Sequence, residues 1–278
     1  MMPPPPHLDA KCNEQDTADL VLAIRAAHEA GELLMRHWQN RDSLRVQIKR
    51  AGDFLSRADT EAEACLRDIL LTARQEDGWL GEETTAQLAP RRRWIVDPLD
   101  GTTNFLRGIA HWAVSVALEV DGIRRIGVVH DPLKGETFAA RIGVGGSLNG
   151  HQIRVAETST LGGALFGTGI PFGDMAHIDT HAADIARLMP HCAGVRRMGA
   201  ASLDLAYVAA GRLDGFWERV LQPWDIAAGL VLLSEAGATV TSLDPRDRPE
   251  RSGTVLTACP GVFDAFAEIL RDQSDRRA

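Results

Sequence analysis

The spacing of apolar residues changes along this chain, and that change limits the possible folds most. From Leu20 to Trp38 the apolar residues fall at helical spacing, and a second amphipathic stretch runs from about Asp59 to Ala73. Short β-favouring runs then follow at 94–96, 112–120, 126–130 and 136–141. Asp121-Gly122 is typical of a hairpin turn between two of these runs. The pattern predicts two helices, the first capped by Asp16 or Thr17, followed by a sheet.

The second half of the chain mixes the two patterns. We expect strands near 165–169, 213–217, 238–241 and 254–257, and helices near 178–189, 201–210, 225–236 and 260–271. Helices and strands that alternate along a chain indicate an α/β or α+β protein. The chain of 278 residues has no internal repeat and no linker within 18–272. We therefore expect a disordered leader at 1–16 and a single domain at 17–278, with packed halves at about 17–150 and about 151–278.

Composition excludes several classes of protein. No apolar run approaches the roughly 18 residues that cross a bilayer, and the opening Met1–Pro6 lacks the basic and apolar regions of a secretory signal. A cytoplasmic protein without membrane contact is expected. The formal net charge of −8, without a basic stripe, disfavours nucleic acid as a partner. The widely separated cysteines predict free thiols rather than disulfides or a zinc site: Cys12, Cys65, Cys192 and Cys259.

The segment that follows the strand at 94–96 carries the most chemical information. It reads Asp97-Pro98-Leu99-Asp100-Gly101, so that two carboxylates enter a turn directly after buried residues. Pro98 biases Asp97 toward extended geometry and Gly101 permits a sharp reversal. The two carboxylates and the Leu99 carbonyl can then face one point. Such hard oxygen ligands suit Mg²⁺ or Mn²⁺ better than zinc.

Two more acidic motifs lie far from this segment along the chain. Gly81-Glu82-Glu83 ends an apolar run, and Pro223-Trp224-Asp225 precedes an apolar helix. Each has an ordinary interpretation, since the glutamates suit a solvated turn and Asp225 suits a helix cap. Together they favour a cation site, because several carboxylates beside apolar strands need neutralisation. Bound cations would attract a phosphate, and a short helix starting at Gly101 would add amide donors.

These motifs resemble those of the inositol monophosphatase family. The resemblance runs from about residue 18 to 270 and includes Asp53–Asp59, Gly199–Asp204 and Phe216–Glu218. It implies a layered αβαβα sandwich, usually dimeric, that hydrolyses small phosphate monoesters with Mg²⁺ and is commonly lithium-sensitive. Leu55 and Ser56 stand where valine and threonine are more usual in the family.

The resemblance also implies roles for individual residues. Two or three Mg²⁺ ions, with Mn²⁺ as a possible substitute, would be held by Glu82, Asp97, the Leu99 carbonyl, Asp100 and Asp225. Thr102, with Glu82, would orient the attacking water, and the amides of Gly101 and Thr102 would touch the phosphate. The alcohol part of the substrate would face Gly199, Ala200 and Glu218. Lys49 and Asp59 match weaker accessory positions, and the role of Lys49 depends on loop spacing.

Three readings of the function remain open at this point. Inositol-1-phosphate or a similar polyol phosphate is the preferred substrate. A histidinol-phosphate phosphatase is the closest alternative, although such relatives more often carry Lys where Thr103 stands. A non-catalytic interaction dimer with a vestigial pocket is the alternative from another class. The presence of every matched carboxylate argues against that reading, because a decayed site should have lost at least one.

Overall fold

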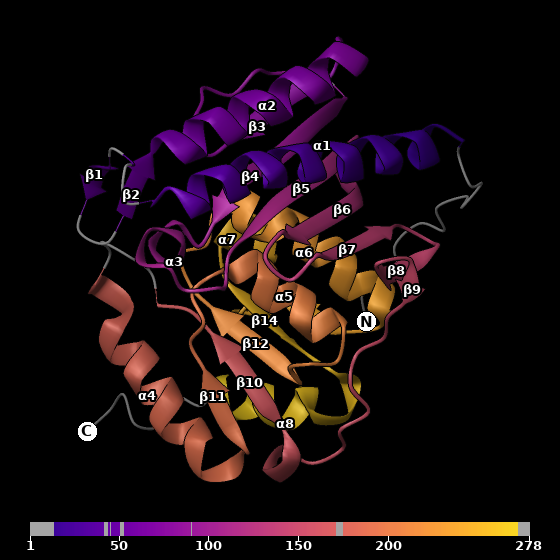
Figure 1. Ribbon diagram of the computed structural model, residues 1–278. Coiled ribbons are helices and arrows are strands. Elements are labelled where there is room, and N and C mark those ends of the chain that lie inside the picture. The colour runs from indigo at the N-terminus through magenta and orange to yellow at the C-terminus, as the bar shows by residue number, and fades with distance from the viewer. Residues whose placement is uncertain are drawn as a thin grey trace.

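Two β-sheets alternate with three layers of helices in the computed structural model (Figure 1). It describes residues 14–41, 44, 46–50, 53–89, 91–170 and 175–271, with the backbone alone at 46–50 and 53–55. The arrangement confirms the layered α/β sandwich expected from the sequence. Within the described part of the chain, no helix has the length and apolarity needed to cross a membrane.

The first outer layer consists of α1 (Glu14–Gln39) and α2 (Arg57–Ala73). The two helices cover one face of a seven-stranded sheet of order β3-β4-β5-β6-β7-β8-β9. Its strands are Gly78–Gly81, Arg92–Asp100, Ala113–Val120, Ile123–Asp131, Glu136–Arg141, Gly145–Leu148 and His151–Gln152. β3 runs parallel to β4, and the remaining pairs are antiparallel. The inner face of α1 carries four alanines and Gly31, and these small residues let the helix lie close to the sheet.

The middle layer consists of α5 (Ala201–Ala209) and α6 (Pro223–Ala236), which lie between the two sheets (Figure 1). A helix covered on several sides is apolar nearly all round, as α6 is. The second sheet has the order β11-β10-β12-β14-β13. Those strands, in that order, are Gly194–Arg196, Leu165–Thr168, Gly215–Glu218, Val255–Ala258 and Thr239–Thr241.

The remaining elements close the molecule. The second outer layer consists of α4 (Ile178–Leu188) and α8 (Pro260–Arg271). A separate hairpin joins β1 (Val46–Arg50) to β2 (Asp53–Ser56). Two short helices are α3 (Thr102–Arg107) and α7 (Pro249–Ser252). Within the described residues, 3₁₀ turns cover Leu161–Gly163, Met175–His177 and Met189–His191.

Most expected elements are present near their expected bounds. The Asp121-Gly122 hairpin is confirmed, because both residues have positive φ angles, 51° and 77°. Cys65, Cys192 and Cys259 are free thiols in the described part of the chain, whereas Cys12 lies outside it. Short strands such as β8, β9 and β11 were not predicted, because runs of only two to four residues carry little periodic signal.

The starts of two elements differ from expectation. α1 begins at Glu14, so residues 14–16 are helical, and the proposed cap Asp16 lies within the helix, where it is paired with Arg125. The other proposed cap, Thr17, is also inside the helix. The strand expected at 94–96 extends from Arg92 through Asp100, because both ends pair with β5. A register shift between Asp97 and Asp100 absorbs the intervening Pro98.

Candidate active site

The sheet itself brings Glu82 next to Asp97. Gly81 pairs with Val96 in the parallel register of β3 and β4, so Glu82, the first residue after β3, lies beside Asp97, which is still part of β4. Asp97 is 2% exposed, and one of its oxygens accepts the Leu99 amide at 3.0 Å. Its pKa lies well above the ordinary value, first because of burial and then because of the negative charges of Glu82, Asp100 and Asp225. The four predicted carboxylates therefore share one electrostatic environment.

Asp100 is oriented by the start of α5. Its Oδ2 accepts the amide of Ser202 at 2.7 Å and the Ser202 hydroxyl at 2.6 Å. Burial raises the pKa of Asp100, and these hydrogen bonds from Ser202 oppose the shift. The contact joins the end of β4 to the segment that begins at Gly199. It explains how two sequence motifs about a hundred residues apart come to one place.

Asp225 reaches the same place through α6. Ser115 lies on β5 and pairs with Asp97 of β4. Its hydroxyl donates a hydrogen bond to the Trp224 carbonyl oxygen at 3.4 Å. The Oδ2 atom of Asp225 accepts the Gln222 amide at 2.7 Å, in a reciprocal capping box. Burial, followed by the charge of Asp100, raises the pKa of Asp225 to about 7. Asp225 is thus both a helix cap and a neighbour of the other carboxylates.

The turn after β4 starts the short helix α3. Gly101 has φ = 90°, and a Cβ at that position would lie 3.0 Å from the His111 carbonyl oxygen, so glycine is required. The Thr102 hydroxyl contacts the Leu99 carbonyl oxygen at 3.0 Å and Asp59 Oδ1 at 3.1 Å. Asp59 is fully buried, and burial raises its pKa against the opposing hydrogen bonds from Ser56 and Thr102. Asp59, which was predicted to have an accessory role, therefore contacts the site through the Thr102 hydroxyl.

The residues predicted to face the alcohol flank this cluster. Gly199 and Ala200 directly precede α5, and the Asn104 side-chain amide donates to the neighbouring Met198 carbonyl at 2.8 Å. Glu218 ends β12 and is 8% exposed. Burial raises the pKa of Glu218 well above its usual value, and the charges of Asp225, Asp204 and Asp100 add to the shift. Lys49 lies in β1, but its side chain falls outside the described part.

Sequence reasoning assigned no role to three residues that orient the site. The carboxylate of Glu63, on α2, accepts the Glu83 amide at 2.8 Å and the Thr84 hydroxyl, which fixes the turn containing Glu82. Ser202 holds Asp100, and His111 lies 3.0 Å from Asp204. Burial lowers the pKa of His111 to about 4 and raises that of Asp204. No spacing rule predicts these contacts, because each depends on how α2 and α5 pack on the sheet.

The donor set fits a hard divalent cation. The oxygens are carboxylates and one backbone carbonyl, and the mutual elevation of the carboxyl pKa values marks negative charge that a cation would neutralise. Over the residues that the structure describes, however, no three His, Cys, Asp or Glu side chains form a group that could hold an ion as they stand.

Comparison with known proteins decides the family. The sequence matches the inositol monophosphatase family over residues 16–274. The chain belongs to the inositol monophosphatase family. One similar family member is the inositol-1-monophosphatase of Rhizobium meliloti, which is 42% identical over 92% of this chain and 97% of its own length. Another is the Nus factor SuhB of Pseudomonas aeruginosa, 43% identical over 91% of this chain and 95% of its own.

A solved structure supports the same assignment. The extragenic suppressor protein suhB from Bartonella henselae superposes with a TM-score of 0.89 and is 37% identical. The match covers 92% of this chain and 99% of that one. The sequence match and the structural match therefore both agree with the family that the motifs of this chain resemble.

Proposed function

We propose that this protein is a Mg²⁺-dependent phosphomonoesterase that hydrolyses inositol-1-phosphate or a related small polyol phosphate. The observation that carries the proposal is the raised pKa of the buried Asp97, on which the negative charges of Glu82, Asp100 and Asp225 all act. Uncompensated buried carboxylates are costly, so a fold that collects them is expected to bind cations. The likeness to a relative named inositol-1-monophosphatase supports the substrate class.

In this proposal the cations are held by Glu82, Asp97, the Leu99 carbonyl, Asp100 and Asp225. Bound Mg²⁺ supplies Lewis acidity and lowers the pKa of a coordinated water. The Thr102 hydroxyl is oriented by Leu99 and Asp59. Its oxygen can therefore accept a hydrogen bond from the attacking water, with Glu82 as the second acceptor. The amides of Gly101 and Thr102, at the start of α3, donate to the phosphate oxygens.

The alcohol part of the substrate lies against Gly199, Ala200 and Glu218 in this proposal. A buried carboxylate such as Glu218 prefers a substrate that donates hydroxyl groups to it, because an analogue without them leaves it unpaired. That preference suits a polyol phosphate. The family resemblance extends the proposal to a cytoplasmic homodimer, inhibition by lithium, Mn²⁺ as a substitute ion, and an accessory role for Lys49.

Phosphate release from a panel of esters tests the proposal. We expect fastest release from inositol-1-phosphate, slower release from histidinol phosphate and fructose bisphosphate, and none after chelation of divalent cations. A preference for histidinol phosphate would replace the substrate and keep the chemistry. If no ester is hydrolysed faster by the wild-type protein than by Asp97→Asn, the protein is an interaction protein rather than a phosphatase.

A further inference from the structure

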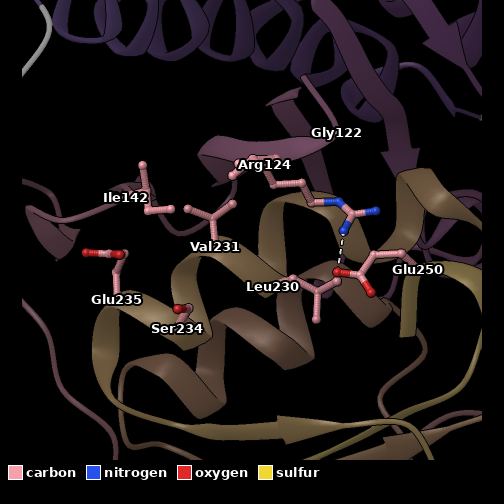
Figure 2. A pocket seen from close by; sticks show the side chains of 9 residues that line it. Gly122, Arg124, Ile142, Leu230, Val231, Ser234, Glu235 and Glu250 are labelled. Carbon is pink, nitrogen blue, oxygen red and sulfur yellow. Dashed lines mark ion pairs between the residues drawn. The ribbon is translucent and has the colours of Figure 1, made fainter. Parts of the chain in front are cut away.

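A pocket lies at the opposite end of α6 from Asp225 (Figure 2). Asp225 is in the first turn of α6, whereas the pocket is bordered by Leu230, Val231 and Glu235 in its second half. The start of β6 and the short helix α7 contribute Arg124 and Glu250. The pocket has a volume of about 240 Å³. It shares no lining residue with the candidate active site.

Arg124 supplies a hydrogen-bond donor that lacks an acceptor. Its side chain is only 10% exposed, and its Nη1 pairs with Glu250 Oε1 at 2.7 Å. Its Nε is shielded from solvent and finds no hydrogen-bond partner among the described residues. Buried guanidinium donors are normally paired, since an unpaired one loses its interaction with water. The guanidinium of this pocket-lining residue therefore carries one donor that no acceptor among the described residues satisfies.

The acidic residues of the pocket are already paired. Glu235 accepts the amides of Gly143, Val144 and Gly145 at 2.9, 3.1 and 2.8 Å. These three backbone amides already hold the negative charge of the Glu235 carboxylate, so Glu235 attracts a cationic ligand less strongly. Glu250 is paired with Arg124. An occupant that brings an acceptor therefore fits the pocket better than an amine or a metal ion.

The size and the apolar wall limit the rest of the occupant. Ile142, Leu230 and Val231 present aliphatic side chains to the pocket. Pockets for drug-sized ligands measure about 300–1,000 Å³, whereas an apolar cavity of about 150 Å³ accepts benzene. A volume of about 240 Å³ therefore fits one ring or a short branched chain.

We propose that this pocket binds a small organic oxyanion, a carboxylate or phosphoryl group on a compact apolar body, with Arg124 as its anchor. The planar guanidinium matches both head groups through two parallel hydrogen bonds. Glu250 is 40% exposed and lies on the four-residue helix α7. Its carboxylate is the group that moves away, which exposes Arg124 to the ligand.

Binding of three related probes to the full-length protein tests the inference. Benzoate and phenylphosphonate carry the oxyanion, and benzyl alcohol is the uncharged counterpart. Ligand-observed NMR is recorded with a chelator present, so that no divalent cation recruits anions to the candidate active site. We expect one or both oxyanions to bind at least about tenfold more tightly than benzyl alcohol. The tighter of the two identifies the head group.

Three variants place the binding in the pocket. Ser234 is an exposed residue at its rim, and Ser234→Phe should fill the space and abolish binding without removing a buried group. Arg124→Met should equalise benzoate and benzyl alcohol. Glu250→Gln should tighten oxyanion binding about two- to fivefold, because the partly exposed Glu250 carboxylate competes with the ligand for Arg124. The exposed Asp68, on α2, provides the control Asp68→Asn, which should change nothing.

The inference is overturned if neither oxyanion binds at millimolar concentration, if benzyl alcohol binds equally well, or if Ser234→Phe retains full binding. The Ser234 variant decides the matter even where Arg124→Met fails to fold. Because the assay uses no divalent cation and no phosphate ester, its failure leaves the proposed phosphatase function untouched.

Discussion

The position of the Glu218 carboxylate depends on the absence of a side chain at one neighbouring residue. A Cβ on Gly169 would lie 2.0 Å from Glu218 Oε1, which is closer than any real contact. Gly169 follows β10, and β10 pairs with the strand that carries Glu218. The chain therefore places glycine where the inward-turned carboxylate passes. The motif around Glu218 was visible in the sequence, but this spatial neighbour was not.

Replacement of Gly169 by alanine should displace Glu218 and change which ester is preferred. We expect kcat/KM for inositol-1-phosphate to fall relative to the other esters, with the Mg²⁺ requirement unchanged. Glu218→Ala should act in the same direction. Gly162→Ala is the matched control, because a Cβ there meets nothing within 4 Å. An altered Mg²⁺ requirement with unchanged substrate ranking would refute this role.

Among the elements, α6 combines two uses of one residue. Asp225 accepts the Gln222 amide as part of a capping box, and the charge of Asp100 helps to raise its pKa. The sequence allowed either interpretation, since an acidic residue before an apolar run suits both. Only the packing of α6 against β5, through Ser115 and Trp224, brings the capping residue into the electrostatic environment of the other carboxylates.

Asp225→Asn separates the cap from the charge. The amide oxygen of asparagine still accepts the Gln222 amide, so the free energy of unfolding should change by less than about 1 kcal/mol. Phosphate release should fall by orders of magnitude, because the proposed site loses a negatively charged ligand for its cation. Urea unfolding and phosphate release measure the two effects. Normal turnover in a stable Asp225→Asn protein would reduce Asp225 to a cap.

The whole molecule is held together in part by a histidine pair between α1 and the first sheet, in which His130 is buried and His28 is exposed. The rings of His28 and His130 lie 4.5 Å apart, and the Thr137 hydroxyl is within 2.8 and 3.0 Å of them. Burial, with a contribution from His28, lowers the pKa of His130 from 6.5 to about 4. The unfolded chain therefore binds more protons than the folded protein between these pH values.

This linkage predicts a loss of stability in acid. The contribution of His130 is complete above its unfolded pKa of 6.5 and is lost as the pH falls toward about 4. Between about pH 7 and about pH 5, the wild-type free energy of unfolding should drop about 1 to 2 kcal/mol more than that of His130→Gln. Urea titrations at both pH values measure the difference. The exposed His151 provides the control His151→Gln, and parallel pH profiles for wild type and His130→Gln would exclude the effect.

Periodicity predicted the layers of the molecule better than it predicted the details of the site. Helices such as α6 and strands such as β5 have strong apolar patterns, so their existence followed from local sequence. The acidic motifs could also be picked out, because Pro and Gly flank them. The contacts made by Ser202 and Glu63 could not, since they join elements that meet only after the sheets and helices pack.

The central claim is tested most directly by comparing wild type with Asp97→Asn. Calorimetric titration measures the Mg²⁺ affinity of each protein, and phosphate release measures its turnover. The charges of all three other carboxylates raise the pKa of Asp97, so Asp97→Asn should weaken Mg²⁺ binding and lower turnover by orders of magnitude in a folded protein. Asp68→Asn, on the exposed face of α2, should behave as wild type. Equal Mg²⁺ affinity and equal turnover in wild type and Asp97→Asn would contradict the account.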